Sequence, residues 1–363
     1  MTIHEEQKRV RTVIMRGGTS RALFIKRSDL PADPRVRDAV ILKLYGSPDV
    51  RQIDGLGGAD ALTSKLAISG RPTRSDADVD YTCGQVSITQ PFVDYAGNCG
   101  NISSAVGPYA IDEGLVDAVE PVTRVRIHQT NTRCILIADV PVKDGKAAVE
   151  GAYHIDGVPG TGARIALDFA DTAGAITGKL LPTGNAVDVL DVPGVGQIEA
   201  SIVDAATPCV FVRAADMGLV GTEVPAAIDA DRDLNDRIER IRGTAAAAVG
   251  IVEDWRAAAQ KSPYLPFFAM VSAPADYLDF TTGQNIAAGD VDLVSRLLFM
   301  LRMHKAYPVT GTVCTGAAAK IPGTLVHQVT RADAQGRPAL RIGHPAGIID
   351  VDACVEAHGG ALR

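Results

Sequence analysis

The stretch Val93–Val116, VDYAGNCGNISSAVGPYAIDEGLV, decides the fold that this sequence predicts. Its Asn98-Cys99-Gly100-Asn101 turn runs into small residues, including Ser103 and Ser104, which indicate the start of a tightly packed helix. Main-chain N–H groups at a helix N-terminus attract anions, and they favour the thiolate form of a cysteine placed there. The turn therefore predicts a carboxylate cradle beside an acid–base group. Taken alone, it also fits an ordinary loop before a buried helix.

Length and composition limit the possible classes of protein. A chain of 363 residues, 46% of them hydrophobic, has two domains by default. A net charge of -7 argues against nucleic acid or an anionic membrane as partner, but not against a small anion. The N-terminal residues lack the apolar segment of a secretory signal, and no apolar run reaches membrane-spanning length. Six scattered cysteines without a CxxC pair favour thiols in a reducing cytoplasm.

A second turn could also hold an anion. Residues 10–25 predict a strand, a glycine turn and a second strand, and the turn contains Arg16, Gly18, Thr19 and Ser20. Main-chain N–H groups, two hydroxyls and an arginine would then lie together. A plain hairpin turn is the simpler interpretation.

One lysine is a candidate base. The glycine-rich loop Asp54–Asp60 precedes Lys65, whose neighbours Leu62, Leu66 and Ile68 are apolar. The lysine is not part of GxxxxGK[ST], so a P-loop is rejected. Partial desolvation would lower its pKa and let it act as a base. From local context alone, a side chain that extends to solvent is the more common outcome.

Other segments complete the expected element order. The sequence predicts a helix over Pro34–Tyr45 capped by Asp33, a strand over Val86–Tyr95, two strands in Val122–Val142, and long helices in Ala227–Trp255 and Gly289–Met303. Neither a dinucleotide-binding motif nor a histidine–cysteine pattern with zinc spacing is present in the sequence.

The two halves of the chain resemble each other. Phe24–Leu30 is echoed by Phe211–Met217, and the helix that follows Cys99 is echoed by the small residues from Cys314 and Thr315 onward. The repeat predicts two similar lobes whose cysteine-led helices point at one cleft.

Further basic residues follow in the second half. Arg302 and His304 lie in RMHKAY, and His344 lies in the rigid turn GHPAG. Each of these basic side chains could bind a substrate carboxylate. The alternatives are a solvated helix end for the first segment and a surface turn for the second.

Six motifs follow one another along the chain and together span nearly all of it. They are MRGGTSRALF at 15–24, DGLGGADALTSKLAI at 54–68, GNCGNISSAVGPYAIDEGLV at 97–116, GKLLPTGN at 178–185, HKAYPVTGTVCTGAAAKIPGTLV at 304–326 and GHPAG at 343–347. In this order they resemble the PrpF family, which shares the diaminopimelate-epimerase-like fold.

The resemblance implies an α+β fold with two pseudo-symmetric β-rich lobes, each curled around a central helix, and an active site between them. We place the lobes at residues 1–185, with Lys65 and Cys99, and 186–363, with Cys314. An alternative keeps the last ~20 residues on the first lobe. A homodimer is plausible because such lobes have exposed sheet edges.

The resemblance also implies chemistry without a metal or other cofactor. Family members isomerise unsaturated di- and tricarboxylates such as 2-methylaconitate, 3-methylitaconate and 4-oxalomesaconate. The family's catalytic lysine falls on Lys65 and its helix-leading cysteine on Cys99. The chain departs from the family pattern at Arg21-Ala22 and at Ala346. Both departures are near expected carboxylate contacts and bear on which acid is the substrate.

The leading hypothesis is a 1,3-allylic proton shift in a small anionic carboxylate. Lys65 would move the proton, and Cys99 would be a second acid–base group or a positioning group. Main-chain amides would stabilise the dienolate. The expected substrate contacts are Arg16, Gly18, Thr19, Ser20, Gly100, Asn101, Ser103, Ser104, Arg302, His304, Thr315 and His344. Two alternatives stay open: a racemase that pairs Cys99 with Cys314, and a carboxylate-binding module without catalysis.

Overall fold

The computed structural model describes residues 8–358 and 361–362. The chain forms two compact units. The first comprises residues up to Tyr95, Asn101–Val149 and Ala163–Asp168, and the second comprises Ala96–Gly100, Glu150–Gly162 and the residues from Phe169 onward. The lobe boundary at 185/186 stays a prediction. Within the described residues, no helix has the length and hydropathy needed to cross a membrane.

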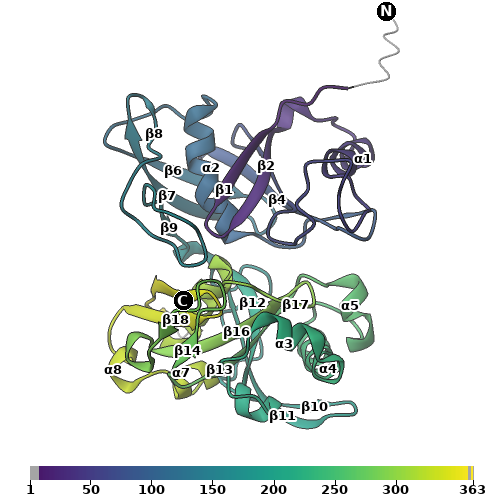
Figure 1. The fold of residues 1–363 in the computed structure, drawn as a ribbon, viewed down its shortest axis with the longest axis vertical. Coiled ribbons are helices and arrows are strands. Elements are labelled where there is room, and N and C mark those ends of the chain that lie inside the picture. Colours follow the sequence, from purple (N-terminus) through teal and green to yellow (C-terminus); the bar gives the residue numbers. More distant parts are fainter. Residues whose placement is uncertain (1–7, 359–360, 363) are drawn as a thin grey trace, which may run out of the picture. The chain divides into compact units, whose positions relative to one another are not determined.

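The first unit is built on one mixed sheet (Figure 1). Its strands are β1 (Val13–Gly17), β2 (Ser20–Lys26), β3 (Lys65–Gly70), β4 (Val79–Val86), β5 (Val93–Asp94), β6 (Val122–Gln129), β7 (Cys134–Lys143), β8 (Lys146–Ala147) and β9 (Ala166–Asp168). The main order is β1-β2-β3-β4-β6-β7-β8, with β5 on β4 and β9 on β7. The β2–β3 and β4–β6 pairs are parallel, and the other pairs along this order are antiparallel.

Two helices cover opposite faces of this sheet. Leu23, Ile25, Leu66 and Ile68 pack with α1 (Pro34–Tyr45), which follows a short 3-10 helix η1 (Arg27–Asp29). Side chains alternate along a strand, so Ser20, Ala22 and Phe24 lie on the other face. There Phe24 contacts Tyr109 of α2 (Gly100–Asp112), with ring centroids 5.2 Å apart. The face that carries α2 is therefore the face to which Lys65, the cross-strand partner of Ala22, belongs.

The second unit repeats this plan. Its strands are β10 (Asp188–Val192), β11 (Gly196–Ala205), β12 (Thr207–Arg213), β13 (Phe267–Ser272), β16 (Leu293–Phe299), β17 (Arg302–Met303), β18 (Ala339–His344) and β19 (Gly347–Asp352). The order β11-β12-β13-β16-β18-β19 has the same sequence of antiparallel and parallel pairs as β1-β2-β3-β4-β6-β7.

Helices and short elements complete the unit. The helices are η2 (Ala170–Thr172), η3 (Ala214–Met217), α3 (Pro225–Ala230), α4 (Arg232–Ala248), η4 (Trp255–Ala257), α5 (Ala258–Lys261), η5 (Ala288–Asp290), α6 (Val309–Lys320), α7 (Leu325–Val329) and α8 (Ala332–Gln335). Two further hairpins are β14 (Tyr277–Leu278) with β15 (Asn285–Ile286), and β20 (Ala357–His358) with β21 (Ala361–Leu362). In the repeat, α4 corresponds to α1 and α6 to α2, because α4 packs on one face of the second sheet and α6 follows β17 as α2 follows β5.

The structure confirms the α+β class, the hairpin at residues 13–26, the duplicated lobes and the helix Pro34–Tyr45. That helix begins where Asp33 accepts hydrogen bonds from the N–H groups of Arg35 and Val36, and it ends at Gly46, whose φ is 69°. Both ends match the sequence signals of an acidic N-cap before proline and a C-terminal glycine.

Three predicted elements are wrong. Gly289–Met303 is not a helix: it contains η5, β16 and β17, and every residue of β16 is buried. A strand buried on both faces has a continuous apolar run that periodicity cannot distinguish from a buried helix. Ala227–Trp255 is two helices, because Asp231 ends α3 and caps α4, which itself ends at Ala248. In Val86–Tyr95, a turn separates β4 from the two residues of β5.

The cysteine-led repeat is also corrected. Cys99 does precede α2 directly, but Cys314 lies inside α6, with Pro308 as the N-cap. Cys314 is fully buried and its Sγ donates to Val203 O at 3.2 Å. The two runs of small residues are alike because both helices pack closely inside a curled sheet, and the position of the cysteine within them differs.

We expect the cap of α1 to contribute measurably to stability. Asp33→Ala should lower the free energy of unfolding by about 1 kcal/mol, since two N–H groups lose their acceptor. Denaturant unfolding measures this change. Asp54→Ala, at an exposed loop residue, is the control, and an equal loss in both variants would contradict the capping account.

Candidate functional site

Lys65 begins β3 and is buried, with 3% of its surface exposed. Its Nζ donates a hydrogen bond of 2.7 Å to Oε1 of Gln85, the residue directly opposite on β4. Its main-chain oxygen accepts a hydrogen bond from the Tyr45 hydroxyl of α1. The interpretation of Lys65 as a side chain that extends to solvent is therefore wrong.

The amide of Gln85 has a defined orientation. Its Nε2 donates to Ala61 O and to Ser64 O, both at 3.2 Å. A flipped amide would turn its oxygen toward these two carbonyl oxygens, so Oε1 must face the amine of Lys65. Gln85 is 3% exposed and was not among the residues predicted for the site.

The glycine turn between β1 and β2 packs on the first turn of α2. Thr19 N donates to Asn101 Oδ1 at 3.2 Å, and a Cβ on Gly17 would overlap the main-chain oxygen of Asn101. Gly18 has a φ of 48°, a conformation that glycine adopts without a steric penalty. Arg16 Nη1 donates to Gly18 O at 2.9 Å. The β1–β2 turn is thus in direct contact with Asn101, the last residue of the second predicted cradle turn.

Two hydroxyls of this turn are buried without a hydrogen-bond partner among the described residues, Thr19 Oγ1 and Ser20 Oγ. Ser20 is 2% exposed. It lies two residues before Ala22 on β2, and so on the same face as Lys65, the partner of Ala22. A buried hydroxyl without a partner is costly, and a bound anion would supply acceptors for both groups.

The start of α2 combines small residues and a thiol. Cys99 is 7% exposed, and Asn101 and Ser103 are buried. Ser104 Oγ donates to Asn101 O at 2.7 Å, so this hydroxyl is used inside the helix. Gly100 packs against Val309 and the N–H of Thr310 at the start of α6, where a Cβ would not fit.

Two buried histidines of the second unit, His304 and His344, each accept a main-chain hydrogen bond at Nδ1. His304 Nδ1 accepts from Ala306 N at 3.1 Å, and His344 Nδ1 accepts from Ala346 N at 3.2 Å. In the neutral form, each ring therefore carries its proton on Nε2. Burial, together with the nearby His304 and Arg296, lowers the pKa of His344 to about 3. His344 is buried, not displayed on a surface turn.

The other three predicted residues, Arg302, Thr315 and Cys314, have contacts within the second unit. Arg302 is exposed, and its Nη1 lies 3.9 Å from Oδ2 of Asp229. Thr315 is buried inside α6, where its hydroxyl is 2.9 Å from the Tyr307 hydroxyl, which is 2.7 Å from that of Ser295. Burial raises the pKa of the Cys314 thiol. The structure gives no support to a substrate contact by Arg302 or Thr315.

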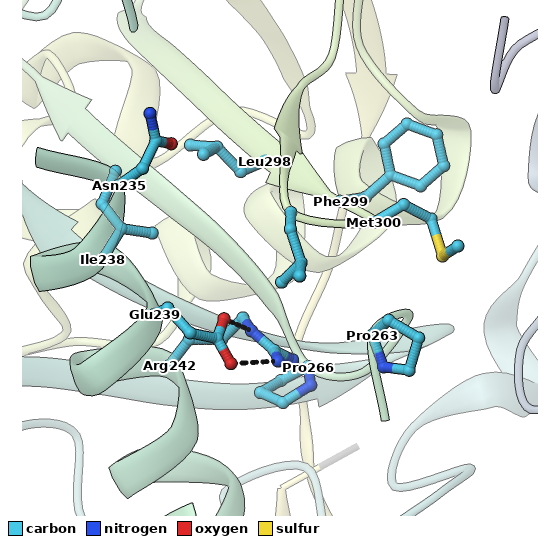
Figure 2. Close-up of a pocket in the computed structure, with 10 residues that line it drawn as sticks. Asn235, Ile238, Glu239, Arg242, Pro263, Pro266, Leu298, Phe299 and Met300 are labelled. Atoms are coloured by element: carbon cyan, nitrogen blue, oxygen red, sulfur yellow. Dashed lines mark hydrogen bonds and ion pairs between the residues drawn. The ribbon is translucent and has the colours of Figure 1, made fainter. Parts of the chain in front are cut away.

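A cavity of about 190 Å³ lies in the second unit between α4 and the β16–β17 turn (Figure 2). Its charged side chains are paired with each other: Arg242 Nε and Nη2 donate to Glu239 at 2.7 and 2.8 Å. The guanidinium also donates to Ser262 O and Leu265 O. Phe299 lines the cavity, and its ring centroid is 5.3 Å from that of His304. The residues predicted for the site do not line it.

Sequence reasoning missed Gln85 and Thr310. Thr310 is fully buried in the first turn of α6, and its Oγ1 has no hydrogen-bond partner among the residues that the structure describes. A polar glutamine between Gly84 and Val86 near the end of β4 was the available signal for Gln85. Within residues 8–358 and 361–362, no group of three or more His, Cys, Asp or Glu side chains is arranged to hold a metal ion.

Comparison with known proteins gives a consistent result. The family described as PrpF protein matches residues 7–362. The chain is 57% identical over 351 residues to the 3-methylitaconate isomerase of Eubacterium barkeri, covering 97% of this chain and 92% of that protein. It is 41% identical to the 2-methyl-aconitate isomerase of Shewanella oneidensis, covering 96% and 90%. The crystal structure of a methylitaconate-delta-isomerase, 56% identical, superposes with a TM-score of 0.81 over 99% of this chain and 92% of that one.

His344 should make stability depend on pH. Its folded-state pKa of about 3 is below the unfolded value of about 6.5, so between these values only the unfolded chain binds the proton. Its contribution to stability is thus complete above pH ~6.5 and is lost as the pH falls toward 3. His344→Gln should make the free energy of unfolding less dependent on pH in this range, by up to ~1.4 kcal/mol per pH unit.

Denaturant unfolding at pH 7 and pH 5 measures the difference. His327→Gln, on α7, is the control variant. Equal pH dependence in wild type and His344→Gln would contradict the buried neutral imidazole.

Proposed function

The chain belongs to the PrpF family and is an isomerase, and from that premise we propose that it shifts a proton between two carbons of an allylic system in an unsaturated di- or tricarboxylate. The substrate is a small acid of the methylitaconate, methylaconitate or oxalomesaconate type. The reaction removes a proton from one allylic carbon, moves the double bond and returns a proton to the other, so substrate and product are isomers. Such a shift requires a base and a means of stabilising the intermediate anion.

Lys65 is the base of this proposal. The observation that carries it is an amine 3% exposed, held at 2.7 Å by a neutral amide and located on the face of the sheet that carries α2. A structural lysine normally extends its ammonium group to solvent or pairs it with a carboxylate. An amine held by a neutral acceptor can take a proton from one carbon and return it to the other.

The anion is held by the β1–β2 turn and the first turn of α2. Ser20 and Thr19 offer two hydroxyls without partners among the described residues, and α2 offers main-chain N–H groups. Asn101, Ser103 and Ser104 belong to this cradle. His304 and His344 stay predicted carboxylate contacts from the sequence, and Arg16, Gly18 and Gly100 shape the turns of the cradle. Donors fixed by folding stabilise charge as it develops in the dienolate.

The racemase alternative receives less support. It needs two exchangeable thiols, and Cys314 is buried inside α6 with its Sγ bonded to Val203 O. Cys99, directly before α2, is a second acid–base group or a positioning group in the proposed reaction. All six cysteines are thiols in the structure, which supports the proposal that the enzyme works in the cytoplasm. A homodimer stays a prediction.

We predict that Lys65→Met abolishes exchange of the allylic C–H into deuterated water and lowers kcat by ~100-fold or more. The exchange is measured by proton NMR on 3-methylitaconate, 2-methylaconitate and 4-oxalomesaconate, and Lys143→Met, at an exposed end of β7, is the control. Near-normal turnover in Lys65→Met would contradict the assignment of the base. A folded wild-type protein that binds these acids without exchange would indicate the non-catalytic module.

The same assay distinguishes one base from two. If Lys65 works alone, Cys99→Ser retains part of the exchange. A complete loss in both variants supports the two-base version.

We predict that Ser20→Ala weakens substrate binding without weakening the fold. A hydrogen bond to a charged group is worth about 1.5–3 kcal/mol, so KM should rise by ~10-fold or more. The free energy of unfolding should stay equal or rise, since the variant removes a buried hydroxyl that lacks a partner among the described residues. An unchanged KM would remove Ser20 from the cradle. Ser28→Ala, at an exposed residue of η1, is the control.

A further inference from the structure

The position of Gln85 follows from strand register. Ala22, Lys65, Gln85 and Asp94 are successive cross-strand partners on β2, β3, β4 and β5. Directly paired residues share a face of the sheet, so these four side chains form one row. In this row, Gln85 lies between Lys65 and Asp94 in the order of the strands.

The amide of Gln85 is hydrogen-bonded to the loop that leads into β3. Gln85 Nε2 donates to Ala61 O and Ser64 O, and the loop is held in turn by Gln52, whose Oε1 accepts from Ala59 N at 2.8 Å and from Ser64 Oγ at 2.7 Å. The Oε1 of Gln85 therefore cannot turn away from Lys65 without losing two hydrogen bonds. This arrangement fixes the direction of the oxygen to which the amine of Lys65 donates.

The chemistry of an amide suits an amine that must change its protonation state. A carboxylate at this position would form a charge-assisted pair and stabilise the ammonium form. The amide oxygen carries no net charge and accepts a hydrogen bond from either –NH2 or –NH3⁺. It can thus position the nitrogen before and after proton transfer.

The second unit provides an internal comparison. By the registers of β12, β13 and β16, Phe267 occupies the place of Lys65 and Phe299 the place of Gln85. Their rings lie edge to face with centroids 6.1 Å apart. The same two positions can therefore be filled by apolar side chains in this fold, so the fold itself does not require the Lys65–Gln85 pair.

We propose that Gln85 is the positioning residue for Lys65: its fixed amide oxygen holds the amine in place as a neutral partner and leaves it able to release and accept a proton. This inference rests on the proposed role of Lys65 as the base. It makes the neutrality of residue 85, and not only its hydrogen bond, a requirement of the reaction.

The test compares pH–rate profiles of the full-length enzyme. Gln85→Glu keeps the shape and adds a charge, whereas Gln85→Met keeps the volume and removes the acceptor. Gln90→Glu adds the same charge at an exposed residue after β4 and serves as the matched control. Other ionisable groups on the surrounding elements are the same in every variant: Arg21 of β2, Tyr45 of α1, Asp60 of the loop, Cys83 of β4, Asp94 of β5, Cys99 before α2 and Tyr109 of α2.

In Gln85→Glu, the acidic limb of kcat/KM should move up by about one to three pH units, with activity recovered at high pH. In Gln85→Met, kcat should fall by ~10-fold or more without an upward shift of this limb. Gln90→Glu should match the wild type. A Gln85→Glu profile that superposes on the wild type, or that is lowered equally at every pH, would overturn the proposal.

A measurement on the unaltered protein gives an independent check. The side-chain amide resonance of Gln85 should change with pH at the same midpoint as the pH–rate profile, and this change should disappear in Lys65→Met. A Gln85 resonance that is independent of pH would overturn the inference. If instead Lys65→Met retains normal exchange, the proposed function fails; if only the Gln85 tests fail, Lys65 remains the base and Gln85 is a structural residue.

Discussion

The register of β2, β3 and β4 is the constraint on which the rest of the first unit depends. Leu23, Ile25, Leu66 and Ile68 must face α1 to form the apolar core, so the alternate positions must face α2. This places Lys65 on the α2 face, although burial of an amine is unfavourable without a hydrogen-bond partner. Gln85 supplies that partner from the next strand. The apolar core on one face thus determines the polar pair on the other.

The two units share one sheet topology, and they differ in the side chains at equivalent positions. The sheet order and the pattern of parallel and antiparallel pairs recur in both units. At equivalent positions, the first unit has Lys65 and Gln85, and the second has Phe267 and Phe299. The helix that lies inside each sheet also differs, since Cys99 precedes α2 whereas Cys314 is buried within α6. The proposed base therefore belongs to one half only.

Local signals were sufficient for much of the fold. Asp33 before Pro34 predicted the start of α1 to the residue, and the glycine turn predicted the first hairpin. The strand Leu293–Phe299 was mistaken for a helix because all its residues are buried, which removes the alternation that identifies a strand. The break at Asp231 was missed because an aspartate that caps one helix also reads as a polar residue on a longer one.

The site could be predicted only in part for a similar reason. Lys65 and the glycine turn stand in sequence motifs, so they could be named. Gln85 could not, because its partnership with Lys65 depends on strand register, and register is set by the packing of both faces together. The hydroxyls of Thr19 and Ser20, which have no hydrogen-bond partner in the described part of the chain, likewise become evident only once the turn is packed on α2.

The most direct measurement is a crystal structure of this enzyme with a bound, non-reacting tricarboxylate. The account predicts that Lys65 Nζ lies within ~3.5 Å of the carbon that corresponds to the exchanging allylic position, with Ser20 Oγ on a carboxylate. A ligand whose allylic carbon faces a different base, with Lys65 still bonded to Gln85 and out of reach, would contradict it.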